Sequence, residues 1–326
     1  MNNSAHLKVG IIIIGRNEGE RLRACFESII QFSVNCVYVD SDSTDGSVKL
    51  ANSFGIKAIS LDMSVPFSAA RARNVGAEFI LKNREDIEFL QFIDGDCTLN
   101  SEWISTALSV CQPQTAIVCG RRKEKYPKES VYNQLCDIEW NTPLGYAKSC
   151  GGDFLIKTDC FKTVEGFNPS VVAGEEPELC YRLREKGFHI LRIDHDMTYH
   201  DANIHNFKQH WMRSVRSGYA YALGFYLHNK PSERHWLREN MSATFWGIFI
   251  PSIIFIGAMF NLAFLFILMI YPLNTLKIFL KVRGELPIPA IYSISLMLGK
   301  FSESVGILKF IKNIIFSQKH RIIEYK

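Results

Sequence analysis

The sequence predicts an α/β protein with a Rossmann-like sheet, mixed but mostly parallel, flanked by helices and followed by an apolar helical region. Three observations lead to this fold class. Short β-branched runs alternate with stretches of helical periodicity in the first hundred residues or so. Polar clusters follow several of these runs, where parallel sheets bind their ligands. The composition changes near Ser242, and residues 245–271 contain no charged side chain.

The alternation begins at residues 9–14, a β-branched run typical of a central parallel strand. The next stretch places Leu22, Cys25 and Phe26 at helical spacing. Repetition of this pattern predicts a mostly parallel sheet with helices on both faces. In chain order, the predicted strands are 9–14, 37–39, 56–61 and 89–93, and the predicted helices are 18–30, 47–54, 69–83 and 101–111.

Beyond the fourth helix the pattern loses its regularity. Residues 121–201 mix glycines and aromatics with polar side chains, as substrate-binding loops do. Residues 208–228 again show helical spacing, with Trp211 and Leu223 on one face. We therefore predict that the middle of the chain forms loops around a site and that a helix closes this part.

The apolar run 245–271 exceeds the roughly 20 residues needed to span a bilayer. One long span and a hairpin or re-entrant pair that breaks near Asn261 are both open. Basic residues flank the run on both sides, which favours the second arrangement under the positive-inside rule. Residues 287–315 are apolar but interrupted by charges, which indicates an interfacial amphipathic helix. A buried pair of core helices in a soluble protein is the alternative for the whole region.

These patterns predict two parts, a catalytic domain and a membrane-associated helical region. The domain boundaries follow the change in composition. The catalytic domain is expected at 1–235 and the helical region at 236–326, with an apolar segment at about 244–281 and an amphipathic segment at about 287–315.

Composition narrows the partners and the compartment. The net charge is +4, from 37 basic and 33 acidic residues, which does not suggest a nucleic-acid binder but fits an anionic membrane surface or substrate. The 9 cysteines form no C-x-x-C pair, so neither a disulfide framework nor a zinc site is implied. The polar first eight residues do not resemble a signal peptide. We therefore expect the cytoplasmic face of the cell membrane, with membrane lipids as partners; the oligomeric state is left open.

Asp94-Gly95-Asp96 follows the predicted strand 89–93. Two carboxylates at the end of a strand suit a hard divalent cation that bridges a diphosphate and stabilises a leaving group. An ordinary turn is the alternative for the same three residues. Asp40 also comes directly after a strand, where a carboxylate can accept a hydrogen bond from a base or a ribose.

Three further sets of residues could carry chemistry. Arg71 and Arg73 lie near a helix start and could pair with diphosphate oxygens, although one of them could equally lie on a solvated helix face. Glu175 and Glu176 crowd together, which raises their pKa values and suits a general base; an acidic first helical turn is the other reading. His200 could bind the same metal as Asp96 or lie on the surface.

The order of these motifs resembles the family 2 glycosyltransferases, which have the GT-A fold. The resemblance covers roughly residues 8–226. The matching segments are 9–18 (VGIIIIGRNE), 37–47 (VYVDSDSTDGS), 67–76 (FSAARARNVG), 92–96 (FIDGD), 150–153 (CGGD), 166–168 (GFN), 174–179 (GEEPEL) and His200.

The resemblance implies an inverting transferase that moves a sugar from a nucleotide sugar, expected to be a UDP-sugar, to a hydroxyl of a lipid-linked or cell-envelope glycan. It implies Mn²⁺ or Mg²⁺ as cofactor. The family's Glu-Asp pair falls on Glu175 and Glu176, which makes Glu176 the candidate base and leaves Glu175 as the alternative. The other implied roles are donor binding by Asn17, Glu18, Asp40, Arg71, Arg73 and Asp94, metal binding by Asp94, Asp96 and His200, and acceptor binding by Trp140, Gly152 and Asp153.

Two rival functions share some of these features. A sugar nucleotidyltransferase would use a similar sheet and metal, but the first strand is followed by Gly15-Arg16-Asn17-Glu18 instead of a glycine-rich loop that carries a lysine. A non-catalytic, membrane-anchored protein that binds nucleotide sugars is the second rival, because a glutamate replaces the family's usual aspartate.

Overall fold

The computed structural model describes residues 8–230, 233–318 and 322–324. The chain divides into two compact units, one that ends at Asn203 and one that begins at Ile204. Helix α9 (Phe207–Leu227) therefore belongs to the second unit, although the sequence places it in the catalytic domain. The boundary near residue 235 stays a prediction about where the catalytic function ends.

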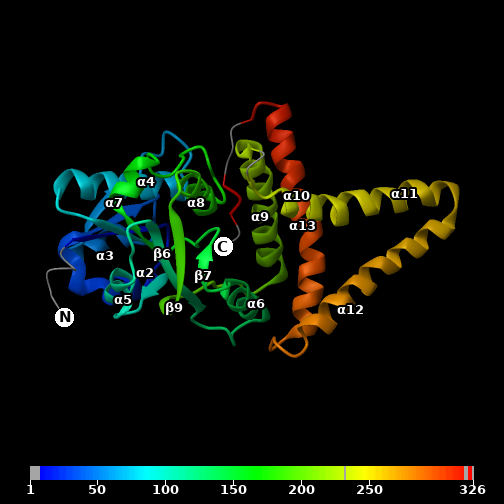
Figure 1. The fold of residues 1–326 in the computed structure, drawn as a ribbon, viewed down its shortest axis with the longest axis horizontal. Helices are drawn as coiled ribbons and strands as arrows, with labels where there is room; N and C mark the ends of the chain where they lie inside the picture. The colour runs from blue at the N-terminus through cyan, green and yellow to red at the C-terminus, as the bar shows by residue number, and fades with distance from the viewer. Residues whose placement is uncertain (1–7, 231–232, 319–321, 325–326) are drawn as a thin grey trace. The chain divides into compact units, whose positions relative to one another are not determined.

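The first unit is built on a nine-stranded mixed sheet with flanking helices (Figure 1). Its order is β3-β2-β1-β4-β8-β6-β9-β5, and β7 pairs with β9. The first four strands in this order run parallel to one another, β6 runs parallel to β9, and the remaining pairs are antiparallel. The strands are β1 (Val9–Gly15), β2 (Cys36–Asp40), β3 (Lys57–Ser60), β4 (Phe89–Asp94), β5 (Cys97–Leu99), β6 (Thr115–Glu124), β7 (Gly145–Ala147), β8 (Phe154–Lys157) and β9 (His189–His200).

The predicted α/β fold class is thus confirmed, and the elements of the first hundred residues lie close to their predicted places. Helix α4, for example, covers Ala69–Asn83, and Ser68 caps it by accepting a hydrogen bond from the Arg71 N–H. The helices of this unit are α2 (Glu20–Ile29), the 3₁₀ helix η1 (Ile30–Asn35), α3 (Ser47–Ser53), α4, α5 (Trp103–Ser109), α6 (Val131–Trp140), α7 (Thr158–Thr163) and α8 (Glu175–Glu185).

The core lies on both faces of the central strands. Strand β1 is buried along nearly its whole length, and β2 is buried throughout. Four phenylalanine rings pack against one another beside β4, with neighbouring ring centroids 5.2–6.2 Å apart, and they come from four separate segments: Phe92, Phe154, Phe161 and Phe167. These contacts fix the segments that carry the polar residues at the edge of the sheet.

Residues 121–201 are more regular than the sequence suggests. They contain α6, α7 and α8 and the strands β7, β8 and β9, which complete the sheet. Strand β9 mixes buried and half-buried polar residues along its length, so it lacks the continuous apolar run of a central parallel strand. The expectation of loops here was wrong because β9 lacks the continuous apolar run by which a buried strand is identified in a sequence.

The second unit is helical. Helices α9 and α13 (Pro289–Ile315) pack along each other, and between α9 and α13 the chain forms an apolar hairpin (Figure 1). The predicted break at Asn261 is present, because α11 ends at Phe260 and η3 begins at Leu262. The other elements are β10 (Asn229–Lys230), β11 (Glu233–Arg234), α10 (Leu237–Thr244), the π-helical η2 (Phe245–Phe249), α11 (Ile250–Phe260), the 3₁₀ helix η3 (Leu262–Met269) and α12 (Ile270–Val282).

Two helical stretches within the described residues are long and apolar enough to cross a membrane by length and composition. They are Leu237–Phe260 and Leu262–Val282, and they share a mean hydropathy of 1.9. In the second stretch, none of the residues in its most apolar part is buried inside the protein. A buried pair of core helices, the alternative raised above, would be covered by other elements, and this stretch is not.

Candidate active site

The parallel register brings the polar motifs to one edge of the sheet. Gly15 pairs with Asp40, and Ile14 pairs with Asp94, so strands β1, β2 and β4 end side by side. Ligands bind at such carboxyl edges because the connecting loops diverge there. The predicted grouping of the motifs around this edge follows from strand register alone.

Asp40 and Asn17 hold the first part of this edge together. Asp40 is 3% exposed and accepts hydrogen bonds from the Tyr38 hydroxyl and the Ser43 N–H, both at 2.9 Å. Asn17, in a left-handed conformation with φ 56°, accepts from the Thr44 N–H at 2.7 Å. Burial raises the pKa of Tyr38, so its hydroxyl stays protonated and serves as a donor to Asp40. The result is a rigid polar loop at the end of β2.

Asp94 lies between two arginines. Its Oδ1 is 2.9 Å from Arg73 Nη2, and its Oδ2 is 3.1 Å from Arg122 Nη2. Burial by itself would raise the pKa of Asp94, but Arg73 and Arg122 hold that pKa below its usual value. Asp94 therefore stays a carboxylate, and its orientation is fixed by two charge-assisted hydrogen bonds.

Asp153 is a buried side chain that holds both Asp94 and Arg122. Its side chain is fully buried; it accepts from the Asp94 N–H at 3.0 Å, from Arg122 Nε at 2.9 Å and from the Thr198 hydroxyl at 2.7 Å. Gly152 passes directly over the same charges, because a Cβ there would lie 2.6 Å from Asp94 Oδ2 and 2.8 Å from Arg73 Nη2. Asp153 is thus a buried support for Asp94, and Gly152, which is also buried, packs directly against the charged side chains.

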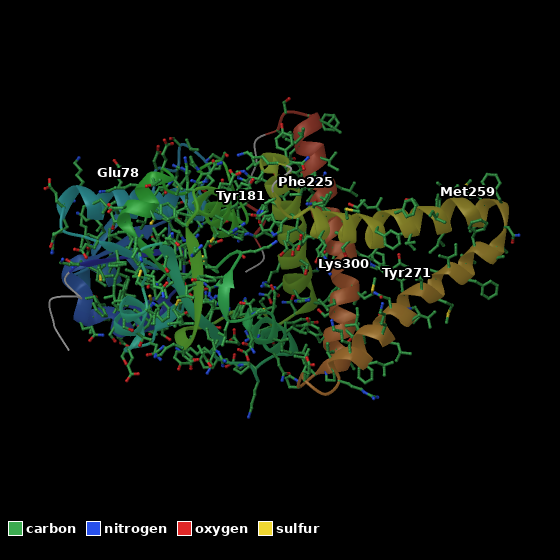
Figure 2. The ribbon with its side chains drawn as sticks, viewed as in Figure 1. Glu78, Tyr181, Phe225, Met259, Tyr271 and Lys300 are labelled. Carbon is green, nitrogen blue, oxygen red and sulfur yellow. The ribbon has the colours of Figure 1, made fainter. Side chains whose placement is uncertain are left out.

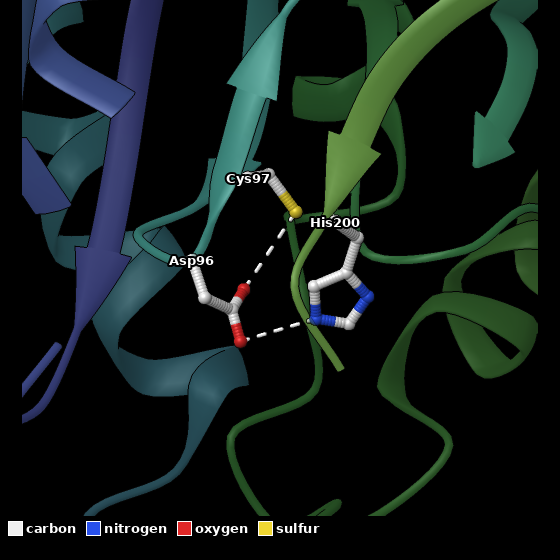
Figure 3. Close-up of side chains that lie close together, drawn as sticks. All are labelled: Asp96, Cys97 and His200. Atoms are coloured by element: carbon white, nitrogen blue, oxygen red, sulfur yellow. Dashed lines mark hydrogen bonds and ion pairs between the residues drawn. The ribbon is translucent and has the colours of Figure 1, made fainter. Parts of the chain in front are cut away.

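Asp96, Cys97 and His200 form a group whose ligand atoms all lie within 4.8 Å of one another (Figure 3). Cys97 on β5 pairs with His200 on β9, which brings the imidazole to the acidic turn. His200 Nε2 is 3.1 Å from Asp96 Oδ2, and both side chains are 8% exposed. A carboxylate and an imidazole suit Mn²⁺, and a carboxylate suits Mg²⁺; the thiol is a poorer ligand for either.

Asp94 is not part of that group. It belongs to a second group with Cys97 and Asp153, and its two oxygens face the arginines. The structure therefore brings Asp96 and His200 together as predicted, while Asp94 lies nearby with different partners. Trp140 stacks on the His200 ring, with centroids 4.7 Å apart, and its own ring lies 5.7 Å from the Arg122 guanidinium. Trp140 thus connects the two groups.

Glu175 and Glu176 begin helix α8, and both face Arg73. Arg73 Nη1 is 2.8 Å from Glu176 Oε1 and 3.5 Å from Glu175 Oε1. The Glu175 side chain is 4% exposed and that of Glu176 is 14% exposed, so Glu176 is the more accessible of the pair. Burial and the nearby Glu175 raise the pKa of Glu176 to about 7, against the opposing effect of Arg73. Such a carboxyl is suited to exchange protons near neutral pH.

Two predicted donor residues have other partners. Arg71 donates to three backbone carbonyls, those of Asp62, Val65 and Pro66, each at 2.8 Å. Glu18 forms an ion pair with Arg21 at 2.8 Å. In this structure Arg71 holds the loop before α4, and of the two predicted arginines only Arg73 enters the charged cluster.

Arg122 and Tyr38 are site residues that the sequence analysis missed. Arg122 ends the apolar part of β6 and contacts both Asp94 and Asp153. The signal was present, because three consecutive basic residues follow a buried apolar run at the end of that strand. Tyr38 lies inside a predicted strand two residues before Asp40, so side-chain alternation places both on one face.

Comparisons with known proteins point to one family of enzymes. The family described as "Glycosyl transferase family 2" matches residues 10–163. The chain is 22% identical over 205 residues to the glycosyltransferase AglE of Haloferax volcanii, across 58% of this chain and 65% of that protein. It is 26% identical over 202 residues to the pre-mycofactocin glycosyltransferase of Mycobacterium tuberculosis, across 56% of this chain and 40% of that protein. The chain thus spans less than two thirds of the length of these relatives.

Among solved structures, the fold is similar to that of a mannosyltransferase from Pyrobaculum calidifontis in complex with GDP-Man and Mn²⁺. The TM-score is 0.62 at 14% sequence identity, and the similarity covers 92% of this chain and 87% of the other. At this identity the likeness concerns the fold, and it extends over both compact units.

Proposed function

Because the chain belongs to the family 2 glycosyltransferases and is a transferase with a GT-A fold, we propose that it transfers a sugar with inversion from a nucleotide sugar to a hydroxyl acceptor. The donor we propose is a UDP-sugar, and the acceptor is a lipid-linked or cell-envelope glycan at the cytoplasmic face of a membrane. The observation that carries this proposal is the link through Arg73, which joins Asp94 at the strand edge to Glu176 on α8.

The proposed donor site follows the edge of the sheet. Asp40, held by Tyr38 and Ser43, offers a carboxylate to the nucleobase, and Asn17 orders the loop beside it. Asp94 faces the ribose or the diphosphate, with its charge and orientation set by Arg73 and Arg122. Arg73 acts here as a positioning residue, because its guanidinium already has three carboxylate partners.

Asp96 and His200 are the residues that we propose hold a divalent cation. The cation would supply positive charge to the leaving diphosphate. Trp140 holds the His200 ring in place by stacking, and β-strand pairing fixes the backbone of His200 opposite Cys97. These contacts orient the ligand before any ion binds, which is the usual task of groups around a metal site.

Glu176 is the proposed base. In its ionised form it takes the proton from the acceptor hydroxyl, and the oxygen attacks the anomeric carbon as the nucleoside diphosphate departs from the opposite face. Glu175 is nearly inaccessible, and its negative charge raises the pKa of its neighbour. We propose that the acceptor lies near Gly152 and Trp140, because Gly152 packs against Asp94 and Arg73 and Trp140 stacks on His200.

A donor screen tests the proposed function. The full-length chain is mixed with Mn²⁺ and, in turn, with diphosphate sugars of uridine, guanosine and thymidine, and thermal unfolding is followed. A ligand present at 100 times its Kd raises stability by about 2.7 kcal/mol, which is a readily measured shift in Tm. The expected result is Mn²⁺-dependent stabilisation by uridine diphosphate sugars. Stabilisation by guanosine compounds alone would reassign the base, and stabilisation by none of the three would contradict the proposal.

A further inference from the structure

The apolar hairpin, defined here as residues 240–276, contains no charged side chain between Glu239 and Lys277. Its arms are α10, η2 and α11 on one side and η3 with the first half of α12 on the other. Between Ser252 and Tyr271 the only side chain that carries a hydrogen-bonding group is that of Asn261. The turn of the hairpin is thus as apolar as its arms, which is unusual for a loop that must lie in water.

Both arms return to the same helix. Gly247 on the first arm meets α13, because a Cβ there would lie 2.5 Å from the Lys300 carbonyl oxygen. On the second arm the Tyr271 ring packs on Phe301, with centroids 5.3 Å apart, and the Tyr271 hydroxyl donates to the Trp246 carbonyl at 2.7 Å. The two arms therefore contact α13 at neighbouring residues, Lys300 and Phe301. The hairpin extends away from this part of α13 and returns to it.

The part of α13 that both arms contact carries charged side chains. Lys300 and Glu303 of α13 form an ion pair at 2.7 Å beside the point where the arms meet the helix. Figure 2 shows Lys300 of α13 beside the start of the first arm and Met259 near the far end of that arm. Charged side chains within a membrane are costly in hydrocarbon, so α13 is expected at the depth of the headgroups. The depth of the turn then depends on how far the hairpin projects from α13.

The projection is short. From Gly247 to Asn261 the first arm has about 14 residues, or roughly 21 Å at about 1.5 Å each. On the other side the 8 residues of η3 extend roughly 16 Å at about 2.0 Å each. The hydrocarbon core of a bilayer is about 30 Å thick. A hairpin that starts at one headgroup layer and projects about 20 Å ends inside the hydrocarbon.

The turn at Asn261 satisfies its backbone hydrogen bonds in the way that a segment within hydrocarbon requires. Backbone polar groups in hydrocarbon must find partners inside the protein. The Asn261 N–H donates to the Gly257 carbonyl at 2.8 Å, the Asn261 side chain accepts from the Ala263 N–H at 2.8 Å, and the Phe264 N–H donates to the Asn261 carbonyl at 3.1 Å. The one polar residue of the turn is thus used within the turn itself.

The side chains around the turn point outward and are large and apolar. Their exposed fractions are 74% for Met259, 85% for Phe260, 72% for Leu262 and 79% for Phe266. A contiguous apolar surface of this kind is unfavourable in water and marks a surface that contacts a partner or a membrane. Basic residues at Arg238 and Lys277 flank the two ends of the hairpin, as expected beside anionic headgroups.

We propose that residues 240–276 form a re-entrant hairpin, which enters and leaves through one face of the membrane and keeps the Asn261 turn within the hydrocarbon. The arms diverge from the turn, and the space between them is an apolar cavity of about 530 Å³, lined by residues such as Ile254, Phe255, Leu265 and Tyr271. Lipid hydrocarbon is the occupant that this lining fits. The inference concerns membrane attachment and is independent of the proposed catalytic roles.

Cysteine accessibility tests the depth of the turn. Phe260→Cys places a thiol at the turn, and Glu285→Cys places one at the exposed turn between α12 and α13. The full-length variants are labelled with a membrane-impermeant maleimide in right-side-out and in inside-out vesicles from producing cells. Peptide mass spectrometry then separates the introduced thiol from the 9 native cysteines, the last of which is Cys180.

The expected result is that Glu285→Cys reacts in one type of vesicle, while Phe260→Cys reacts at least about tenfold less in both types than it does after detergent is added. Reaction of Phe260→Cys in the opposite type of vesicle would overturn the proposal, because the turn would then lie in water beyond the bilayer. Reaction in the same type of vesicle as Glu285→Cys would also overturn it, because the hairpin would then lie outside the membrane. Met259→Cys, at a position that is 74% exposed, repeats the test at a second site of the turn.

Discussion

The pair Glu175 and Glu176 predicts a specific change in the pH dependence of sugar transfer. The proposed base is the ionised form of Glu176, whose pKa is raised to about 7 by burial and by Glu175. Activity should therefore rise with pH through about 7 and level off above it, because kcat/KM reports the ionisation of the free enzyme. Glu175→Gln removes a negative neighbour and keeps the size of the side chain, so the pKa of Glu176 should fall.

The structure sets the size of the shift. Glu176 Oε1 and Glu175 Oε1 lie 2.8 and 3.5 Å from the same atom, Arg73 Nη1, so they are at most about 6.3 Å apart. At an effective dielectric constant of about 20, two unit charges at this distance interact by about 2.6 kcal/mol. One pKa unit corresponds to about 1.4 kcal/mol, so the full interaction is nearly two units. Arg73 offsets part of it, and we expect the acidic limb to move down by about one to two units.

The assay is kcat/KM for nucleotide-sugar turnover between about pH 5 and pH 9 for wild type, Glu175→Gln and the control Glu185→Gln. Glu185 lies at the far end of the same helix, exposed, and accepts a hydrogen bond from the Tyr181 hydroxyl that glutamine can also accept. The control limb should stay in place. A limb that does not move in Glu175→Gln, or that moves to higher pH, would refute the electrostatic reasoning. Loss of all activity in Glu175→Gln with activity kept in Glu176→Gln would show that Glu175 is the base.

Three further predictions concern the charges around this pair. Asp96→Ala should abolish the Mn²⁺ dependence of nucleotide binding, because Asp96 and His200 form the proposed metal site. Calorimetry with and without the ion measures this dependence, and an unchanged Mn²⁺ effect would place the metal elsewhere. Arg122→Ala leaves the fully buried Asp153 without its cation and should cost about 3–5 kcal/mol in a denaturant titration. The control Arg121→Ala removes a partly exposed ion pair with Asp194 and should cost less than about 1 kcal/mol. Equal losses would contradict the assigned role of Arg122. Gly152→Ala should lower kcat/KM at least about tenfold, because its Cβ would lie 2.6 Å from Asp94 Oδ2. The control Gly151→Ala, whose Cβ would have no atom nearer than 3.8 Å, should retain near-normal activity. Similar values for the two variants would exclude a tight contact at Gly152.

Strand order and register explain why much of the site could be predicted from sequence. Asp40 and Asp94 each follow an apolar run, and parallel strands end at one edge, so their proximity required no tertiary information. The grouping of Asp96 with His200 is different. It depends on the antiparallel pairing of β5 with β9, which joins residues about a hundred positions apart. The sequence offered it as one of two readings of His200, and the family resemblance then implied it.

Other features could not be predicted because they depend on packing between distant segments. The charged partners of Asp94 come from α4 and β6, and no local pattern indicates that Arg73 and Arg122 meet the same carboxylate. Arg71 and Arg73 look equivalent in the sequence, but they project in different directions from the first turn of α4. As a result, Arg71 contacts loop carbonyls and Arg73 contacts carboxylates. The mixed burial of β9 likewise hid a strand that the sheet requires.

The variant Glu176→Gln determines whether Glu176 deprotonates the acceptor at a metal-dependent donor site. Donor binding with Mn²⁺ is measured by calorimetry, and turnover is measured as release of the nucleoside diphosphate in the presence of acceptor, both for wild type and for the variant. If Glu176 is the base, the Kd for the donor stays unchanged and turnover falls by at least about a hundredfold, the usual contribution of a general base. Near-normal turnover in Glu176→Gln would contradict this role.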